Sequence, residues 1–122
     1  MAFGWIYTFL SVGLLAVSAE FIWSRPVHNM ARFAVSEYNK DSTDLYASKL
    51  IKIISAKVEV NDDVKYILIV EIGRTQCLKM DNMDIDICPI SNFDNVICHF
   101  IVVNVPSENI TKLVERNCSS GL

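Results

Sequence analysis

The amino-acid sequence predicts an α+β domain in which one helix packs across a four-stranded antiparallel sheet. Three observations lead to this prediction: an apolar stripe with helical spacing, four β-branched segments that follow it, and four cysteines that all lie at position 77 or later. A helix and a sheet that are each apolar on one face stabilise one another when those faces are buried together. The length of 122 residues suits one such domain.

The chain begins with an uncharged, apolar segment, residues 1–19, which ends in the small-x-small triplet Val17-Ser18-Ala19. This pattern is typical of a signal peptide. The apolar run is shorter than the about 20 residues that a membrane span requires. The sequence therefore predicts a signal peptide over 1–19 and a secreted domain over 20–122, with no membrane contact after cleavage. Because no Lys or Arg precedes the apolar run, an uncleaved membrane anchor is the alternative.

The first predicted element of the domain is a helix over Asn29–Lys40, NMARFAVSEYNK. Met30, Ala34 and Tyr38 recur at i, i+4 and i+8, which places them on one helical face. Asn29 is a candidate N-cap, and Pro26 lies just ahead of it. The stripe is apolar enough to cover a sheet, so we interpret it as ordinary core.

Four segments with alternating or continuous β-branched residues predict the strands. They are Leu45–Val60, Val64–Ile72, Val96–Val105 and Ile110–Cys118. Only Asn61–Asp63 separates the first two, and such a short polar link predicts an antiparallel hairpin. The turn-prone Pro106–Asn109 joins the last two in the same way.

The four cysteines predict two disulfides if the chain is secreted. Three pairings are possible, and local sequence favours Cys77–Cys88 and Cys98–Cys118, because each closes a short loop. The polar segment Leu78–Asn95 is then a surface loop held by one disulfide. No Cys-x-x-Cys is present, so no metal site is predicted.

Composition and motifs exclude several classes of function. The net charge is −3 and the basic residues are scattered, which argues against nucleic acid and against an anionic membrane surface. His28 and His99 fit structural or surface roles, and oxidised cysteines are not nucleophiles. No nucleotide or catalytic motif appears, so neither an enzyme nor a cofactor is predicted. Two acidic pairs carry ligands suited to calcium, but each fits a solvated turn better: Asp62 with Asp63, and Asp84 with Asp86.

The segments ARFAVSEYNK and SAKVEV…VKYILIVEIGRTQC, the cysteine spacing and a late Val-Pro together resemble the type 2 cystatins. The resemblance covers Ala31–Cys118. Its most specific parts are Phe33–Lys40 and Gly73-Arg74-Thr75-x-Cys77. It implies the same fold, a secreted protein, and the disulfides Cys77–Cys88 and Cys98–Cys118.

The resemblance also implies a function, because this family inhibits papain-like cysteine proteases with a wedge of three parts. The first hairpin tip normally carries Gln-x-Val-x-Gly. Here those positions are Glu59, Val60, Asn61, Asp62 and Asp63. Glycine permits a positive φ and a close backbone approach, whereas Asp63 adds a Cβ atom and a charge. Burying an unpaired carboxylate in a protease cleft is costly, so this tip is a poor apolar wedge.

The second hairpin tip of the family carries Pro-Trp. Pro106 matches, but Ser107 stands in place of tryptophan. An aromatic anchor of this kind typically contributes about 2 kcal/mol or more at an interface. Asn109-Ile110-Thr111 is also an acceptor for N-glycosylation, and a glycan at Asn109 would stand on this tip. Asn117-Cys118-Ser119 fits the same pattern, but its cysteine is expected to be bridged.

The third part of the wedge is a flexible N-terminal segment with a glycine. No glycine lies between Leu14 and Ile72, so the segment Glu20–His28 lacks it. Some cystatins also inhibit legumain through an asparagine in the loop after the helix. That position is Thr43 here, which does not support this activity.

We therefore hypothesise a secreted cystatin-family protein with a degenerate wedge and little or no inhibition of papain-like proteases. It would act through another protein partner or by self-assembly, and it resembles the divergent cystatins of the male reproductive tract. The alternative is a weak or selective inhibitor whose acidic tip suits a protease cleft with a basic rim. Self-association would use a strained first hairpin that opens, or the β-rich segment Tyr66–Ile72.

Overall fold

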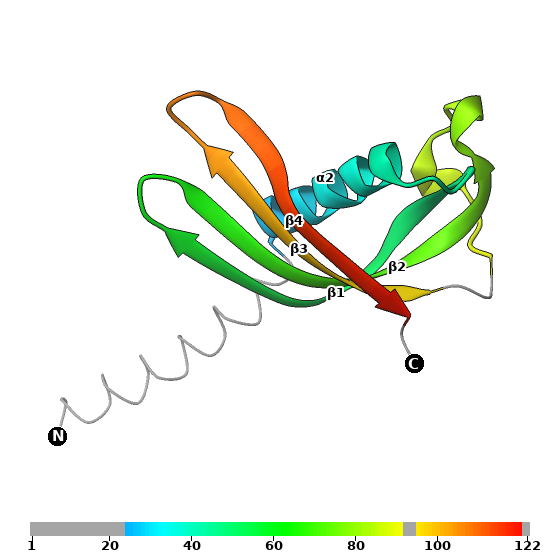
Figure 1. The fold of residues 1–122 in the computed structure, drawn as a ribbon, viewed down its shortest axis with the longest axis horizontal. Coiled ribbons are helices and arrows are strands. Elements are labelled where there is room, and N and C mark those ends of the chain that lie inside the picture. The colour runs from blue at the N-terminus through cyan, green and yellow to red at the C-terminus, as the bar shows by residue number, and fades with distance from the viewer. Residues whose placement is uncertain (1–23, 92–94, 121–122) are drawn as a thin grey trace, which may run out of the picture.

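The computed structural model describes residues 24–91 and 95–120, and within them one helix crosses a four-stranded antiparallel sheet (Figure 1). The predicted α+β class is therefore confirmed. The strands are ordered β1-β2-β3-β4, as in two successive hairpins joined side by side. The elements are α2 (Arg25–Asp41), β1 (Tyr46–Val60), β2 (Val64–Leu78), β3 (Val96–Val105) and β4 (Ile110–Ser120). The predicted signal peptide, residues 1–19, lies outside the described residues and stays a prediction.

Helix α2 begins four residues earlier than the sequence predicted. Its N-cap is Ser24 rather than Asn29, and the Ser24 carbonyl accepts the His28 backbone N–H at 3.0 Å. Pro26 lies in the first helical turn, where a backbone N–H has no intrahelical acceptor and its loss costs little. Val27 is fully buried on the same face as Ala31, so the extra turn lengthens the apolar stripe.

Two strands are longer than predicted. β2 continues past Ile72 to Leu78, because Gly73 and Arg74 keep their pairing with Lys49 and Ser48 of β1. β4 continues past Cys118 to Ser120. Register shifts within the β1–β2 pair accommodate the added length. The two hairpins are therefore long and curved.

The core lies between the helix and the two central strands. It consists of Val27, Ala31, Ala34 and Val35 of α2, Leu68, Val70 and Ile72 of β2, and Cys98, Phe100 and Val102 of β3. Alternate residues of each strand face the helix, as the period of two requires. Complete burial of a Val, Leu, Ile or Phe side chain stabilises the fold by about 1.5–3 kcal/mol. The rings of Tyr38 and Phe100 add a tilted contact with their centroids 6.2 Å apart.

Both predicted disulfides are present, Cys77–Cys88 and Cys98–Cys118. The first holds the segment between β2 and β3, which contains two short 3₁₀ helices, η1 (Lys79–Asp81) and η2 (Ile85–Ile87). Figure 1 shows this segment at one end of the molecule and both hairpin tips at the other, where α2 begins. We call residues 77–88 the disulfide loop.

Candidate functional site

The residues that carry the family resemblance hold the scaffold together. Asn39 joins the end of α2 to β1: its Oδ1 accepts the Ser48 N–H at 2.9 Å, and its Nδ2 donates to the Ser48 carbonyl at 2.8 Å. Gly73 is buried, and a Cβ atom there would lie 2.7 Å from Cδ1 of Ile51 and 2.9 Å from Oδ1 of Asn95. These motifs therefore specify the fold rather than a contact with a partner.

Arg74, in the second of these motifs, lies in a local network that sequence reasoning missed. Its Nη2 donates to Oδ1 of Asp44 at 2.8 Å, and its guanidinium stacks 5.1 Å from the centre of the Tyr46 ring. Partial burial acts to raise the pKa of Asp44. The hydrogen bonds from the Tyr46 N–H and from Arg74 outweigh it, so the pKa lies below its ordinary value of 3.8. The network fixes the start of β1 against the far end of β2.

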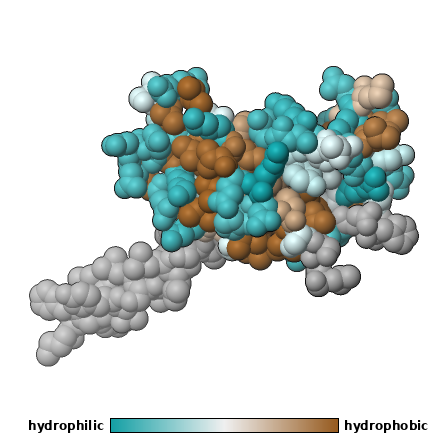
Figure 2. All heavy atoms as spheres, in the orientation of Figure 1, coloured by the Kyte–Doolittle hydropathy of each residue, from teal (hydrophilic) through white to brown (hydrophobic). Residues whose placement is uncertain are grey.

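The first hairpin tip is the predicted Asn61–Asp63, and all three residues are exposed. Val60 pairs with Val64 to close the hairpin, and the Asn61 N–H donates to the Asp63 carbonyl at 3.0 Å. Val60 is the apolar member of the tip, with 69% of its surface exposed. In the space-filling view this tip, at the left edge, is coloured as hydrophilic (Figure 2).

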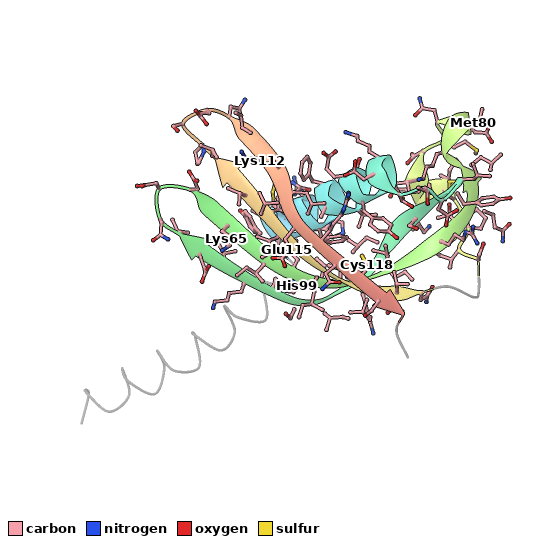
Figure 3. The ribbon with its side chains drawn as sticks, in the orientation of Figure 1. Lys65, Met80, His99, Lys112, Glu115 and Cys118 are labelled. Atoms are coloured by element: carbon pink, nitrogen blue, oxygen red, sulfur yellow. A yellow bond between two sulfur atoms is a disulfide. The ribbon has the colours of Figure 1, made fainter. Side chains whose placement is uncertain are left out.

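Charge at this tip is distributed unevenly. The Glu59 carboxylate lies 3.7 Å from Nζ of Lys57 and 3.9 Å from Nζ of Lys65, so two lysines surround it. Lys65 projects from the hairpin just before the tip (Figure 3). Among residues 24–91 and 95–120, Asp62 and Asp63 form no ion pair. The end of the hairpin therefore carries two uncompensated negative charges.

The tip contains no left-handed backbone, so its dihedral angles give no support to the sequence-based expectation of a strained hairpin. In the part of the chain that the structure describes, the non-glycine residues with positive φ are Asn82 and Asn109. Asn61, Asp62 and Asp63 make the three-residue turn without left-handed backbone, so the turn needs no glycine. What separates Asp63 from the family's glycine is its side chain and its charge.

The second hairpin tip is Pro106–Asn109, and all four residues are exposed. The Glu108 N–H donates to the Val105 carbonyl at 3.1 Å, and the Asn109 N–H donates to the Pro106 carbonyl at 3.3 Å. Asn109 has φ 52°, a left-handed conformation that asparagine tolerates better than most residues. The tip has no aromatic side chain, because Ser107 follows Pro106.

The third part of the predicted wedge, the segment Glu20–His28, lies only partly within the described residues. From Ser24 onward it is the N-cap and the first turn of α2. The structure brings the two hairpin tips to one end of the sheet, and α2 begins on that side of the molecule, inward of the tips (Figure 1). The predicted site residues Glu59–Asp63 and Pro106–Ser107 do form those tips.

The remaining candidate residues have structural partners. Oδ1 of Asp84 caps η2 by accepting the Asp86 N–H at 3.0 Å, and Asp86 pairs with Arg32 at 2.9 Å. The Arg32 hydrogen bond lowers the pKa of Asp86. No group of three metal-ligating side chains occurs among residues 24–91 and 95–120. No helix in this described part is long and apolar enough to span a membrane.

The helix across four antiparallel strands, the paired hairpin tips and the two disulfides define a cystatin-like domain. Residues 23–107 match the Cystatin domain family. The cystatin of Coturnix japonica is 40% identical over 91 residues, which cover 71% of this chain and 78% of that protein. Cystatin-C of Bos taurus is 38% identical over 96 residues, covering 75% of this chain and 64% of that protein.

Solved structures show the same similarity. Dimeric human cystatin F has a TM-score of 0.73 at 27% identity, and the match covers 81% of this chain and 82% of that one. Al-CPI has a TM-score of 0.73 at 27% identity, covering 82% and 94%. The chain belongs to the cystatin family, and its relatives support membership of the type 2 cystatins. Cystatins are typically inhibitors of cysteine proteases.

Proposed function

We propose that this chain is a secreted cystatin that gives little or no inhibition of papain-like cysteine proteases and acts through another protein partner. The retained scaffold and the altered tips are also the reason why we liken this chain to the divergent cystatins of the male reproductive tract. On this proposal the protein is not an enzyme, and its two hairpins form a binding surface.

The observation that carries the proposal is the exposed, acidic first tip. Asp62 and Asp63 stand at the end of the hairpin with no ion-pair partner in the described part of the chain. Insertion into an apolar cleft would remove water from both carboxylates, and a desolvated, unpaired charge costs several kcal/mol. Glu59 would be stripped of water as well, although Lys57 and Lys65 compensate its charge.

The second tip supports the same conclusion. Without an aromatic side chain after Pro106, it lacks the anchor that dominates interfaces of this kind. We expect a glycan on Asn109, and this would place a bulky, hydrated group on the same tip. Both tips are then unsuited to a narrow apolar cleft, for different physical reasons.

A weak or selective inhibitor is the second candidate, and one observation favours it. The charges of Asp62 and Asp63 are exposed and unpaired within the described residues, so a protease with a basic rim would compensate them without desolvating either fully. Val60 and Pro106 are exposed beside them and would supply apolar contact.

The test is a titration of papain and of a cathepsin with the protein purified from cells that express the 122-residue chain. We expect no inhibition at tens of micromolar. A restored variant carries Glu59→Gln, Asn61→Val, Asp63→Gly and Ser107→Trp. We expect it to inhibit at least about thirtyfold more tightly, because one buried aromatic anchor contributes about 2 kcal/mol.

A matched control places similar changes at the opposite end, Met80→Trp with Asp81→Gly, and should restore nothing. Sub-micromolar inhibition by the unaltered chain would contradict the proposal. Inhibition confined to the tens-of-micromolar range, or to one protease with a basic rim, would favour the second candidate. Failure of the restored variant would show that the tips are not the contact surface.

A further inference from the structure

A second concave surface lies along α2, between the helix, β1 and the disulfide loop. It is a cleft of about 850 Å³, within the range of about 300–1,000 Å³ that is typical of ligand sites. Its lining comes from α2 (Arg32, Phe33), β1 (Lys49, Leu50) and the disulfide loop (Lys79, Ile85). Because the disulfide loop lies at the end of the molecule away from the hairpin tips, the cleft is separate from both tips (Figure 1), although its lining reaches His28, the last residue of the predicted N-terminal wedge segment.

The cleft is lined by cations in a chain that is acidic overall. Its lining contains four Lys or Arg side chains, Arg32, Lys40, Lys49 and Lys79, against one carboxylate, Asp86. Arg32 pairs with Asp86 and Lys40 pairs with Glu37, so among the described residues Lys49 and Lys79 are the lining cations without a carboxylate within ion-pair distance, in a chain whose net charge is −3. This contrast arises from the fold, because the four cations come from three separate segments.

Two of these cations, Lys49 and Lys79, donate hydrogen bonds to neutral carbonyls, and they act on the carboxylates of Asp86 and Asp44 only at longer range. Nζ of Lys49 donates to the Cys88 carbonyl at 2.7 Å, and Nζ of Lys79 donates to the Ser42 carbonyl at 2.9 Å. Within residues 24–91 and 95–120 neither ammonium pairs with a carboxylate. Both side chains are half-buried, so a carboxylate brought into the cleft would interact with them more strongly than at an open surface.

Apolar surface accompanies the charge. Phe33, Leu50, Met83 and Ile85 contribute to the lining, and the disulfide loop carries further exposed apolar residues outside it. Met80 is 87% exposed and Ile87 67%. Figure 3 shows Met80 at the outer end of the loop, and Figure 2 shows apolar colour at the same end, at the upper right. Methionine side chains adapt their shape to a partner, which suits a peptide better than a small rigid molecule.

We propose that this cleft binds an acidic peptide segment of a partner protein, with apolar side chains between its carboxylates. Lys49 and Lys79 receive the carboxylates, and the apolar side chains lie against Phe33, Leu50 and Ile85. Arg32 is already paired with Asp86, so it closes the side of the cleft rather than offering a free charge. The proposal names a partner chemistry within the proposed function, yet the site stands apart from the protease question.

The test uses ¹⁵N-labelled protein from the full chain and the synthetic peptide DLEIDF, acetylated and amidated at its ends. We expect its amide shifts to map to α2 and the disulfide loop, and the neutral peptide NLQINF to bind at least about tenfold more weakly. Lys49→Gln and Lys79→Gln should each weaken binding about fivefold, which corresponds to one partly screened ion pair.

Matched variants separate charge from folding. Lys57→Gln, the same change near the other end of β1, should leave binding unchanged, and Lys49→Arg should retain it. Equal binding of the acidic and neutral peptides, or shifts at the hairpin tips, would overturn the proposal. Binding of oleate with the same lysine dependence, but not of the peptide, would overturn it in favour of a small amphipathic anion. Protease inhibition by the unaltered chain, with the peptide still mapping to the cleft, would defeat the proposed function and support this site.

Discussion

At the scale of single residues, the positions that identify this chain as a cystatin are structural. Asn39 joins α2 to β1, and Gly73 allows Ile51 to approach the backbone of β2. Arg74 fixes Asp44 and covers Tyr46. None of these side chains lies at a hairpin tip. A scaffold can therefore keep its sequence signature while residues at its hairpin tips differ.

The Asp44–Arg74 pair should make stability depend on pH. Because the pKa of Asp44 is lower in the folded chain than its ordinary value of 3.8, the pairing stabilises the fold above that pH. The stabilisation is lost as the pH falls through the lowered pKa. Asp44→Asn keeps the acceptor for the Tyr46 N–H but removes the charge, so we expect a loss of about 1 kcal/mol at pH 7.

Thermal unfolding of the unaltered chain and of Asp44→Asn at pH 7 and near pH 2.5 checks this prediction. The difference in Tm should be largest at neutral pH and should shrink as the pH falls below 3.8, the ordinary pKa of Asp44. Asp62→Asn, which changes a carboxylate without an ion pair in the described part of the chain, should leave Tm unchanged. A difference for Asp44→Asn that grows on acidification would contradict the assignment.

At the scale of elements, the two hairpins expose different side chains at their turns. The first ends in an acidic three-residue turn made entirely with negative φ, and the second in a four-residue turn closed by left-handed Asn109. The side chain of Asn104 supports the second turn by donating to Oγ1 of Thr111 at 2.8 Å. Both turns are well-defined platforms, so what each binds depends on its exposed side chains.

Asn109 is expected to carry an N-linked glycan when the chain is made in eukaryotic cells. It is exposed at the end of a hairpin, within Asn109-Ile110-Thr111. Mass measurement before and after treatment with peptide N-glycosidase checks this. Asn109→Gly should abolish the mass change while it preserves the positive φ. Ser119→Ala, which removes the other acceptor sequence, should not; the reverse pattern would assign the glycan to Asn117.

At the scale of the whole molecule, the segment proposed for self-association is protected. Tyr66–Ile72 lies in β2, which pairs with β1 on one side and with β3 on the other. Among the described residues the edge strands are β1 and β4. Lys49, Lys52 and Lys57 lie along β1, and lysines on an edge strand disfavour pairing with another chain.

We therefore expect the native protein to be a monomer and to associate only when partly unfolded. Size-exclusion chromatography with light scattering checks the native state over a wide concentration range. The same measurement after warming toward Tm should show larger species. A concentration-dependent dimer in the unheated sample would contradict this prediction and restore self-association as a native property.

Much of the fold could be predicted because its signals are local. The period of the helix, the alternation in the strands and the loop-closing cysteine spacings each need only neighbouring residues. The start of α2 could not be placed, because Pro26 is compatible with either side of a helix boundary and only burial of Val27 decides it. The end of β2 depended likewise on pairing with residues that come earlier in the chain.

The sequence by itself determined the class of fold and the acidic and aromatic-free character of the two hairpin tips, since these follow from residue types at fixed local positions. It favoured the cysteine pairs, which the structure then confirmed. Tertiary structure alone decided that the first tip turns without left-handed backbone and that Asp44 meets Arg74. It alone also decided that Lys49 and Lys79 face one cleft beside α2. The physical reason is that charges and backbone conformations depend on partners brought together by packing, which residue order does not specify.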